Sequence, residues 1–447
     1  MPEPTKPAER PPSSVPLTEP RYVVPLVLIT SLFFLWALGV NLNDILIPHL
    51  KAAFGLTDFQ SSFIQVAFFG GYFIAAFPAG WLMERIGYRK GILVGLILCA
   101  LGALLFLPAA SFRVYGFFLF SLFVMACGQS FLEVAANPYV TVLGPPESAE
   151  RRLNLTQSFN AVGAVVTPFI GAAFILTATE YSASQLAALS PAQIEAYRTV
   201  QVNTVRVPYL IIAGIFLAVA ALIYFTHLPE VREPGDSGGR DAAPRGLRGI
   251  LAHGHLLRGV LAQFFYVGAQ VGVASFVIRF AQHVETGLSA KDAAHYLQLH
   301  IFGFMIGRFA GSAIMKHVPA PRLLALFAGC CLACAGVAVA ASGASPVYAI
   351  VLIGFFHSIM FPTIFALSIK NLGAYTKRGS SLLVMSIIGG AFFPALMGRI
   401  SDASNIQTAF FVPLVCYVYV LYFALAGYKP SSLPTPESAR ALESVAK

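Results

Sequence analysis

The stretch GWLMERIGYRKG, from Gly80 to Gly91, is a short charged segment between two long apolar runs. It follows the spacing G-x-x-x-[DE]-R-x-G-x-[RK]-[RK]. A glycine at position 80 allows two helices to approach closely, and Gly87 suits a tight turn because glycine adopts backbone angles that other residues avoid. The charged residues, which can form a network at the ends of two helices, are Glu84, Arg85, Arg89 and Lys90.

Apolar runs on both sides of this segment continue along the whole chain. The 447 residues are 57% hydrophobic and 11% charged, whereas a soluble domain is about 25% charged. Runs of about 18 to 25 residues match the ~30 Å hydrocarbon core of a bilayer at ~1.5 Å rise per residue. The sequence therefore predicts an all-α membrane protein with twelve transmembrane helices. The expected spans are 22–50, 61–83, 91–111, 114–142, 153–178, 205–227, 257–285, 293–316, 321–341, 346–370, 379–400 and 406–427.

The spans fall into two halves that repeat weakly. Gly80 and Gly311 occupy like places after spans two and eight, and such repeats predict pseudo-two-fold symmetry. Ser190 and Pro191 could start a short helix outside the membrane, or that segment could be a solvated loop. The expected parts are a disordered cytoplasmic tail (1–21), an N-terminal six-helix half (22–227), a cytoplasmic linker (228–256), a C-terminal six-helix half (257–427) and a cytoplasmic tail (428–447).

The charge of the chain indicates its orientation in the membrane. Lys and Arg number 29 against 20 Asp and Glu, which gives a formal net charge of +9. Most of the basic residues fall in loops that face the cytoplasm if the N-terminus is inside, as the positive-inside rule requires. We therefore expect both termini in the cytoplasm, anionic lipid as the partner of the basic loops, and no nucleic-acid partner.

The sequence offers no group of residues for catalysis or metal binding. All six cysteines lie in apolar runs, without the spacing and histidine partners of a zinc site. It contains no nucleotide-binding loop and no nucleophile paired with a base. We expect a protein that is not an enzyme and that holds no cofactor and no metal.

Two acids lie deep inside the predicted spans, Asp44 in span one and Glu133 in span four. A carboxylate in hydrocarbon costs about 2.5–3.5 kcal/mol on insertion scales, so such a residue faces a cavity, pairs with a partner or takes up a proton. Counting along the helices places Glu133 ~7 Å from the membrane centre on the cytoplasmic side, and Asp44 ~12 Å from the centre on the external side. Acids at two depths suit a proton path, and the alternative for each is a structural role in joining helices.

Amides and aromatic residues surround these acids at helical spacing. Uncharged polar groups with aromatic faces are typical of a site for hydroxyl-rich sugars, although each amide could instead join two helices. We expect Arg308 in span eight to bind backbone or lipid, and His357 in span ten to be packed inside the protein. The candidate binding residues are Asn41, Asn43, Glu133, Asn137, Gln157, Asn160, Gln263, Tyr266, Gln270 and Phe361.

Longer segments carry a resemblance to a known family. FFLWALGVNLNDILIPHL, FLEVAANPYVTVLGP, RLNLTQSFNAVGAV, LAQFFYVGAQ, FPTIFALSIKNLG and GSSLLVMSIIGGA resemble the fucose:proton symporter family of the major facilitator superfamily, which also contains bacterial glucose/galactose transporters. The spacing from Gly80 to Gly91 is the superfamily signature between helices two and three. Its charge network would hold one state of a cytoplasmic gate, and the alternative is a basic loop without that role.

The resemblance implies a bacterial inner-membrane transporter with the major facilitator fold, which alternates access and takes up a hexose with a proton. The positions that match the family's proton-binding acids are Asp44 and Glu133, and those that match its amides are Asn41, Gln157 and Asn160. The chain departs from the fucose branch at Val40, Ala274 and Phe361, so the identity of the sugar stays open.

The sequence thus favours proton-coupled uptake of a neutral monosaccharide, L-fucose or a related hexose, by a monomer. In this hypothesis Glu133 couples sugar to proton and Asp44 relays protons from outside. Two alternatives remain open, a sodium-coupled glucose/galactose carrier and a proton-driven exporter.

Overall fold

The structure is a computed structural model that describes residues 15–174, 185, 188–226, 228–229, 247–285 and 288–430. Over these ranges the regular elements are all helical, and ten helices are long and apolar enough to cross a membrane. One of the ten, 63–112, is interrupted at Gly87 and covers two predicted spans, while α4 supplies the span that is not among the ten. Each of the twelve predicted spans thus overlaps one or two of the described helices. The predicted tails and linker fall largely outside the described residues, so the domain limits stay predictions.

The N-terminal half contains one turn that the sequence marks clearly. Gly87 has φ 79° and ψ 172° within α2, a conformation that glycine adopts readily. The chain reverses at this residue, as the packing of Gly91 against Met83 shows. This confirms the predicted turn. The helices of this half are α1 (Val23–Phe54), α2 (Asp58–Phe112), α3 (Tyr115–Val142), α4 (Ala149–Phe174), α6 (Pro191–Thr204) and α7 (Arg206–Phe225), with short 3₁₀ turns at Pro20–Tyr22 and Pro146–Ser148.

The surface helix α6 begins where the sequence indicated. Ser190 caps it by accepting from the backbone N–H of Gln193, whose side chain accepts from the N–H of Ser190 in return. Glu195 on its first turns forms an ion pair with Arg113, at the outer end of α2. The helix therefore forms and is held against the N-terminal half, which excludes the solvated loop that was its alternative.

The C-terminal half interrupts two of its spans. Span ten is divided into α12 (Ser345–His357) and α13 (Met360–Ile369), and span eleven into α14 (Thr376–Met385) and α15 (Gly389–Ala403) around a 3₁₀ turn at Ser386–Ile388. The other elements are α8 (Leu247–Leu251), α9 (Gly254–Val284), α10 (Ala290–Ile314), α11 (Ala320–Ala340), a 3₁₀ turn (Gly373–Tyr375), α16 (Ile406–Ala409), α17 (Phe411–Tyr422) and a π-helical turn (Phe423–Gly427).

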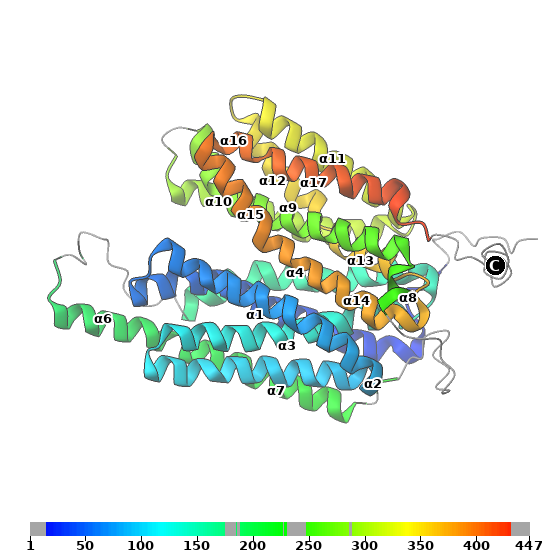
Figure 1. Ribbon diagram of the computed structural model, residues 1–447, viewed down its shortest axis with the longest axis horizontal. Coiled ribbons are helices and arrows are strands. Elements are labelled where there is room, and N and C mark those ends of the chain that lie inside the picture. Colours follow the sequence, from blue (N-terminus) through cyan, green and yellow to red (C-terminus); the bar gives the residue numbers. More distant parts are fainter. Residues whose placement is uncertain are drawn as a thin grey trace, which may run out of the picture.

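The helices pack in the same pattern in both halves. α1 packs on α4 as α9 packs on α15, and α2 packs on α3 as α10 packs on α12. Between the halves, α4 meets α10 and α2 meets α14, which are equivalent pairs. Figure 1 shows the N-terminal half below and the C-terminal half above, closest together near α14 and α8. This repeated packing is the pseudo-two-fold symmetry that the sequence predicted.

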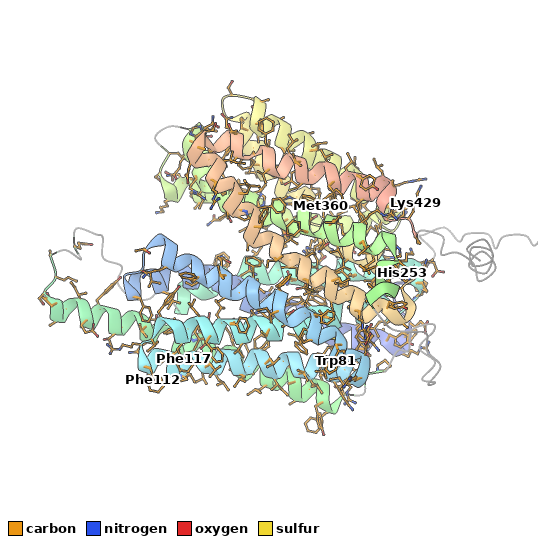
Figure 2. The ribbon with its side chains drawn as sticks, in the orientation of Figure 1. Trp81, Phe112, Phe117, His253, Met360 and Lys429 are labelled. Atoms are coloured by element: carbon orange, nitrogen blue, oxygen red, sulfur yellow. The ribbon has the colours of Figure 1, made fainter. Side chains whose placement is uncertain are left out.

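The labelled side chains in Figure 2 relate the two ends of the molecule to the predicted orientation. Trp81, His253 and Lys429 lie toward one end, and Phe112 and Phe117 lie toward the other. Trp81 lies at the predicted inner end of span two, and His253 and Lys429 belong to the linker and tail predicted to be cytoplasmic. Phe112 and Phe117 lie near the turn between α2 and α3, which is predicted to be external. The end at which the halves meet is therefore the predicted cytoplasmic end.

A buried arginine fixes the turn between α3 and α4, at the predicted cytoplasmic end. Arg152 is fully buried and donates to the carbonyl of Val140 (2.7 Å), the carbonyl of Leu17 (2.8 Å) and the hydroxyl of Ser148 (2.9 Å). Burial lowers the pKa of this guanidinium to about 10, so it stays charged at neutral pH. Arg152 thereby ties the segment before α1 to the ends of α3 and α4, the helices that carry Glu133 and Gln157.

Candidate functional site

Glu133 lies on a polar stripe of α3. Gln129 precedes it by one turn and Asn137 follows by one turn, and residues four apart share a helix face. Glu133 is 6% exposed, and Gln129 and Asn137 are fully buried. The acid is therefore enclosed by protein, in agreement with the expectation that an intramembrane carboxyl group needs partners.

The second predicted acid lies on α1. The backbone of this helix includes Asn43 and Asp44, but their side chains lie outside what the structure describes, so their roles stay predictions. The side chain of Asn41 is described, and its Nδ2 donates to the carbonyl of Ala37 at 2.7 Å. Asn41 therefore makes a bond within its own helix and is only partly buried.

A chain of hydrogen bonds runs from Glu133 across the interface between the halves. Asn137 Nδ2 donates to the Glu133 carbonyl (3.1 Å), and Gln157 Nε2 donates to Asn137 Oδ1 (2.7 Å). Arg308 Nη1 donates in turn to Gln157 Oε1 (3.1 Å). The guanidinium also interacts electrostatically with Glu133. The stripe on α3 is thus linked through α4 to α10 of the other half.

Arg308 completes this chain at the break in span ten. Its Nε donates to the Ser358 carbonyl at 3.0 Å, and the residue is 4% exposed. That carbonyl is free because the residue four positions on is Pro362, which has no N–H to donate. The expectation that Arg308 binds backbone is confirmed at this carbonyl, and its bond to Gln157 adds a link between the halves.

The aromatic candidates lie on the other side of the same break. Tyr266 is fully buried and donates from its hydroxyl to the His357 carbonyl at 3.0 Å. His357 is also fully buried, and its Nε2 is 2.7 Å from the Tyr417 hydroxyl, which confirms the prediction of a packed histidine. The Phe361 ring lies 6.5 Å from that of Tyr266. These contacts bring Tyr266 and Phe361 together beside Arg308.

The remaining amides are not joined to this chain by the described contacts. Asn160 Nδ2 donates to the Phe33 carbonyl of α1 at 3.2 Å. Gln270 is partly buried on α9. Gln263 is fully buried, and neither of its amide atoms has a partner among the described residues. Their contact with a ligand remains a prediction.

The charged residues of the GWLMERIGYRKG segment separate into different contacts. Glu84 forms an ion pair of 2.7 Å with Arg378 of α14, in the other half. Arg85 stacks over the Trp81 ring, and Arg89 Nη2 donates to the Tyr224 carbonyl at the end of α7 (2.6 Å). Lys90 is exposed. Among these contacts, the one from Glu84 crosses between the halves. Gly80 lies against α14 as well, where a Cβ would overlap Ser381 Oγ.

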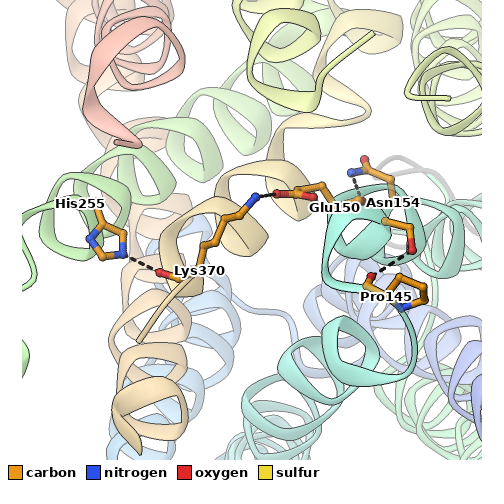
Figure 3. Close-up of polar contacts among 6 residues, drawn as sticks. Pro145, Glu150, Asn154, His255 and Lys370 are labelled. Carbon is orange, nitrogen blue, oxygen red and sulfur yellow. Dashed lines mark hydrogen bonds and ion pairs between the residues drawn. The ribbon is translucent and has the colours of Figure 1, made fainter. Parts of the chain in front are cut away.

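A second ion pair joins the halves nearby. Lys370, just after α13, donates to Glu150 Oε1 at 2.9 Å, and its carbonyl accepts from His255 (Figure 3). Asn154 Nδ2 adds a bond of 3.1 Å to Thr363 Oγ1. These contacts lie at the predicted cytoplasmic end. The described conformation is therefore closed at the predicted cytoplasmic end.

Three basic residues of this interface were absent from the candidate site, Arg308, Lys370 and Arg378. For Arg308 the available signals were its depth in an apolar span and the proline in span ten that releases a carbonyl. The ion pairs of Lys370 and Arg378 join residues 220 and 294 positions apart, and the local sequence holds no signal for such pairings.

The chain is similar in sequence to transporters of one superfamily over most of its length. The profile of the Major Facilitator Superfamily matches residues 29–387. A glucose/galactose transporter of Brucella abortus biovar 1 (strain 9-941) is 42% identical over 415 residues, 92% of this chain and 96% of the relative. An L-fucose-proton symporter of Escherichia coli (strain K12) is 44% identical over 406 residues, 90% of this chain and 93% of the relative.

A solved structure resembles the whole architecture. It is described as the crystal structure of a major facilitator transporter, FucP, in the outward conformation, and it is 44% identical in sequence. The TM-score is 0.82, with 90% of this chain and 98% of that chain covered. Its conformation agrees with the closed cytoplasmic end described above.

Proposed function

Because the chain belongs to the major facilitator superfamily, we propose that it is a secondary active transporter that carries a neutral hexose into the cell together with a proton. The observation that carries this proposal is the buried carboxyl group of Glu133, which interacts electrostatically with Arg308 of the other half. Arg308 also donates to Gln157, which donates to Asn137, one turn from Glu133. The names of the relatives, an L-fucose-proton symporter and a glucose/galactose transporter, support the substrate class.

Glu133 acts as the coupling acid in this proposal. When ionised it attracts the Arg308 guanidinium, and this attraction favours the packing of α10 on α4 that closes the cytoplasmic end. Burial disfavours the ionised form of a carboxyl group, so the same site can accept a proton from outside. Protonation removes the attraction, and sugar hydroxyls compete for the amides of the chain. The interface then loosens and the cytoplasmic end opens.

The ion pairs Glu84–Arg378 and Glu150–Lys370 serve as the cytoplasmic gate. Both join the two halves, so both must break when that end opens. Gly80 allows α2 to approach α14 of the other half. The other residues proposed for the gate act within the N-terminal half: Gly87 sets the turn in α2, and Arg85, Arg89 and Lys90 stabilise its inner end.

The sugar site lies between the halves at the level of Glu133. L-fucose or a related monosaccharide would contact Asn137, Gln157 and Tyr266, with Phe361 as an apolar face. The further contacts proposed from the sequence are Asn41, Asn43, Asn160, Gln263 and Gln270, and Asp44 would relay protons from outside. We place the protein in a bacterial inner membrane as a monomer, with both termini in the cytoplasm and its basic loops on anionic lipid.

Reconstituted proteoliposomes test this function. A counterflow panel of L-fucose, D-glucose, D-galactose, D-mannose and L-galactose identifies the sugar, and uptake is then driven by a proton gradient or by a sodium gradient at clamped pH. We expect accumulation with the proton gradient only. Glu133→Gln should abolish accumulation while counterflow continues. Accumulation by this variant, or accumulation driven by sodium in the native protein, would overturn the assignment.

A further inference from the structure

One buried amide in the N-terminal half has no place in the network described above. Gln129 is fully buried on α3, and within the described part of the chain neither its amide nitrogen nor its amide oxygen has a hydrogen-bond partner. Buried polar groups of native proteins are almost always bonded to protein or to ordered water. This amide therefore indicates a partner other than the described side chains.

The position of the amide narrows the choice of partner. It lies against α1, where a Cβ at Gly39 would be 2.8 Å from Gln129 Nε2 and 3.7 Å from the Phe216 ring of α7. Gly39 has no side chain and the Phe216 ring carries no hydrogen-bonding group, so neither residue's side chain can pair with the amide of Gln129. Glu133 follows one turn later, ~6 Å along the helix axis. Gln129 thus lies between α1 and Glu133, inside the N-terminal half and away from the interface with the other half.

Other charged, titratable and polar groups surround Glu133 on α10, α2 and α1. Arg308 of α10 interacts with it electrostatically, and lies toward the predicted cytoplasmic end, where it binds Gln157. Tyr72 of α2 is within electrostatic range, and its hydroxyl accepts from Trp36 Nε1 at 3.0 Å. Cys99 of α2 lies within electrostatic range of Tyr72. Asp44 belongs to α1, but its side chain is not among those that the structure describes. On α3, two polar groups lie on the outer side of Glu133: Ser130, whose hydroxyl donates to the Tyr72 carbonyl at 3.0 Å, and Gln129.

We propose that Gln129 holds an internal water molecule that also binds the carboxyl group of Glu133, and that this water is the last step of the proton path from outside. The proposal rests on the role of Glu133 proposed above. An internal water needs two to four polar partners, and the amide of Gln129 and the carboxyl group of Glu133 can supply them. The water donates to the ionised carboxylate and thereby favours the ionised form while the cytoplasmic end is closed.

The variant Gln129→Leu removes the amide and retains most of its volume. We measure uptake driven by a fixed proton gradient across a series of pH values, together with counterflow, in proteoliposomes. Without the water the ionised form of Glu133 is less favoured, so the alkaline limb of the uptake profile should move upward by about one pH unit, the size expected for one hydrogen bond to a charged group. Counterflow should persist. An unshifted profile would overturn the proposal.

Two glycine variants test the same point without changing Gln129. Gly39→Ala displaces the amide and should shift the profile in the same direction. Gly214→Ala on α7, where the added Cβ meets nothing within 4 Å, is the matched control and should not. If Gln129→Leu fails to fold, the Gly39→Ala result decides. If the pH profile is unshifted and Glu133→Gln shows counterflow without sugar accumulation, only the role of Gln129 is overturned. If Glu133→Gln still accumulates sugar, the proposed function itself is overturned.

Discussion

Removal of the Glu84–Arg378 ion pair should shift the protein toward its cytoplasm-open state. Glu84 Oε1 lies 2.7 Å from Arg378 Nε, and Arg378 Nη2 donates to Glu84 Oε2 at 2.8 Å. The pair thus combines one hydrogen bond with a second close ionic contact, and the two side chains are only 19% and 11% exposed for Arg378 and Glu84. Because the bond joins the two halves, it must break before the cytoplasmic end can open, and its full free energy favours the closed state.

The size of the shift follows from the geometry. Hydrogen bonds to charged groups contribute about 1.5–3 kcal/mol, and partial exposure screens such pairs, so we assign this one about 2 kcal/mol. At about 1.4 kcal/mol per factor of ten, Glu84→Gln should lower the ratio of closed to open molecules by about 30-fold. A double-mutant cycle with Arg378→Gln should recover the same coupling energy of about 2 kcal/mol, because residues in direct contact do not add independently.

The populations can be measured by double electron–electron resonance. Spin labels at Glu147→Cys and His317→Cys, both exposed at the cytoplasmic end, would report the distance between the halves in a background without the six native cysteines. We expect a longer distance in Glu84→Gln. The matched control is Glu195→Gln, which removes the Arg113–Glu195 pair within one half. Unchanged distances in Glu84→Gln, or an equal change in the control, would show that this ion pair does not hold the cytoplasmic end closed.

Three further predictions concern single side chains. Gly80→Ala should also open the cytoplasmic end, since the Cβ would overlap Ser381 Oγ, whereas Gly70→Ala, with nothing within 4 Å, should leave the label distances unchanged. Arg308→Lys should reduce accumulation by roughly tenfold or more, because an ammonium cannot reproduce the planar guanidinium that reaches both halves; native accumulation at equal expression would contradict this. Arg152→Gln should lower the free energy of unfolding by about 2–4 kcal/mol, since it leaves several buried acceptors unpaired. A thermal unfolding midpoint equal to that of the native protein would show that these bonds are dispensable.

Much of the fold could be predicted because its causes are local. Apolar length gives each span, Ser190 caps α6, and Gly87 adopts the positive φ of its turn. These signals act within a few residues of the positions they specify. The repeat of the two halves is also readable, since Gly80 and Gly311 mark equivalent helix ends.

The site was predicted less completely because its contacts are distant in sequence. Glu133 and Gln157 were identified from chemistry and depth, but their link to Arg308 depends on the packing of α10 against α4. The break in span ten contributes a free carbonyl, and Pro362 signals its presence without indicating which side chain will bind it. Gln129 has no local signal at all, because a glutamine in an apolar helix is equally compatible with a paired and an unpaired amide.

Simultaneous measurement of proton and sugar flux tests the central claim most directly. Proteoliposomes carrying a pH-sensitive dye inside are given the transported sugar outside, without an imposed gradient. We expect sugar entry to acidify the interior in the native protein, and Glu133→Gln to move sugar without any pH change. Sugar entry without acidification in the native protein, or acidification that survives in Glu133→Gln, would contradict it.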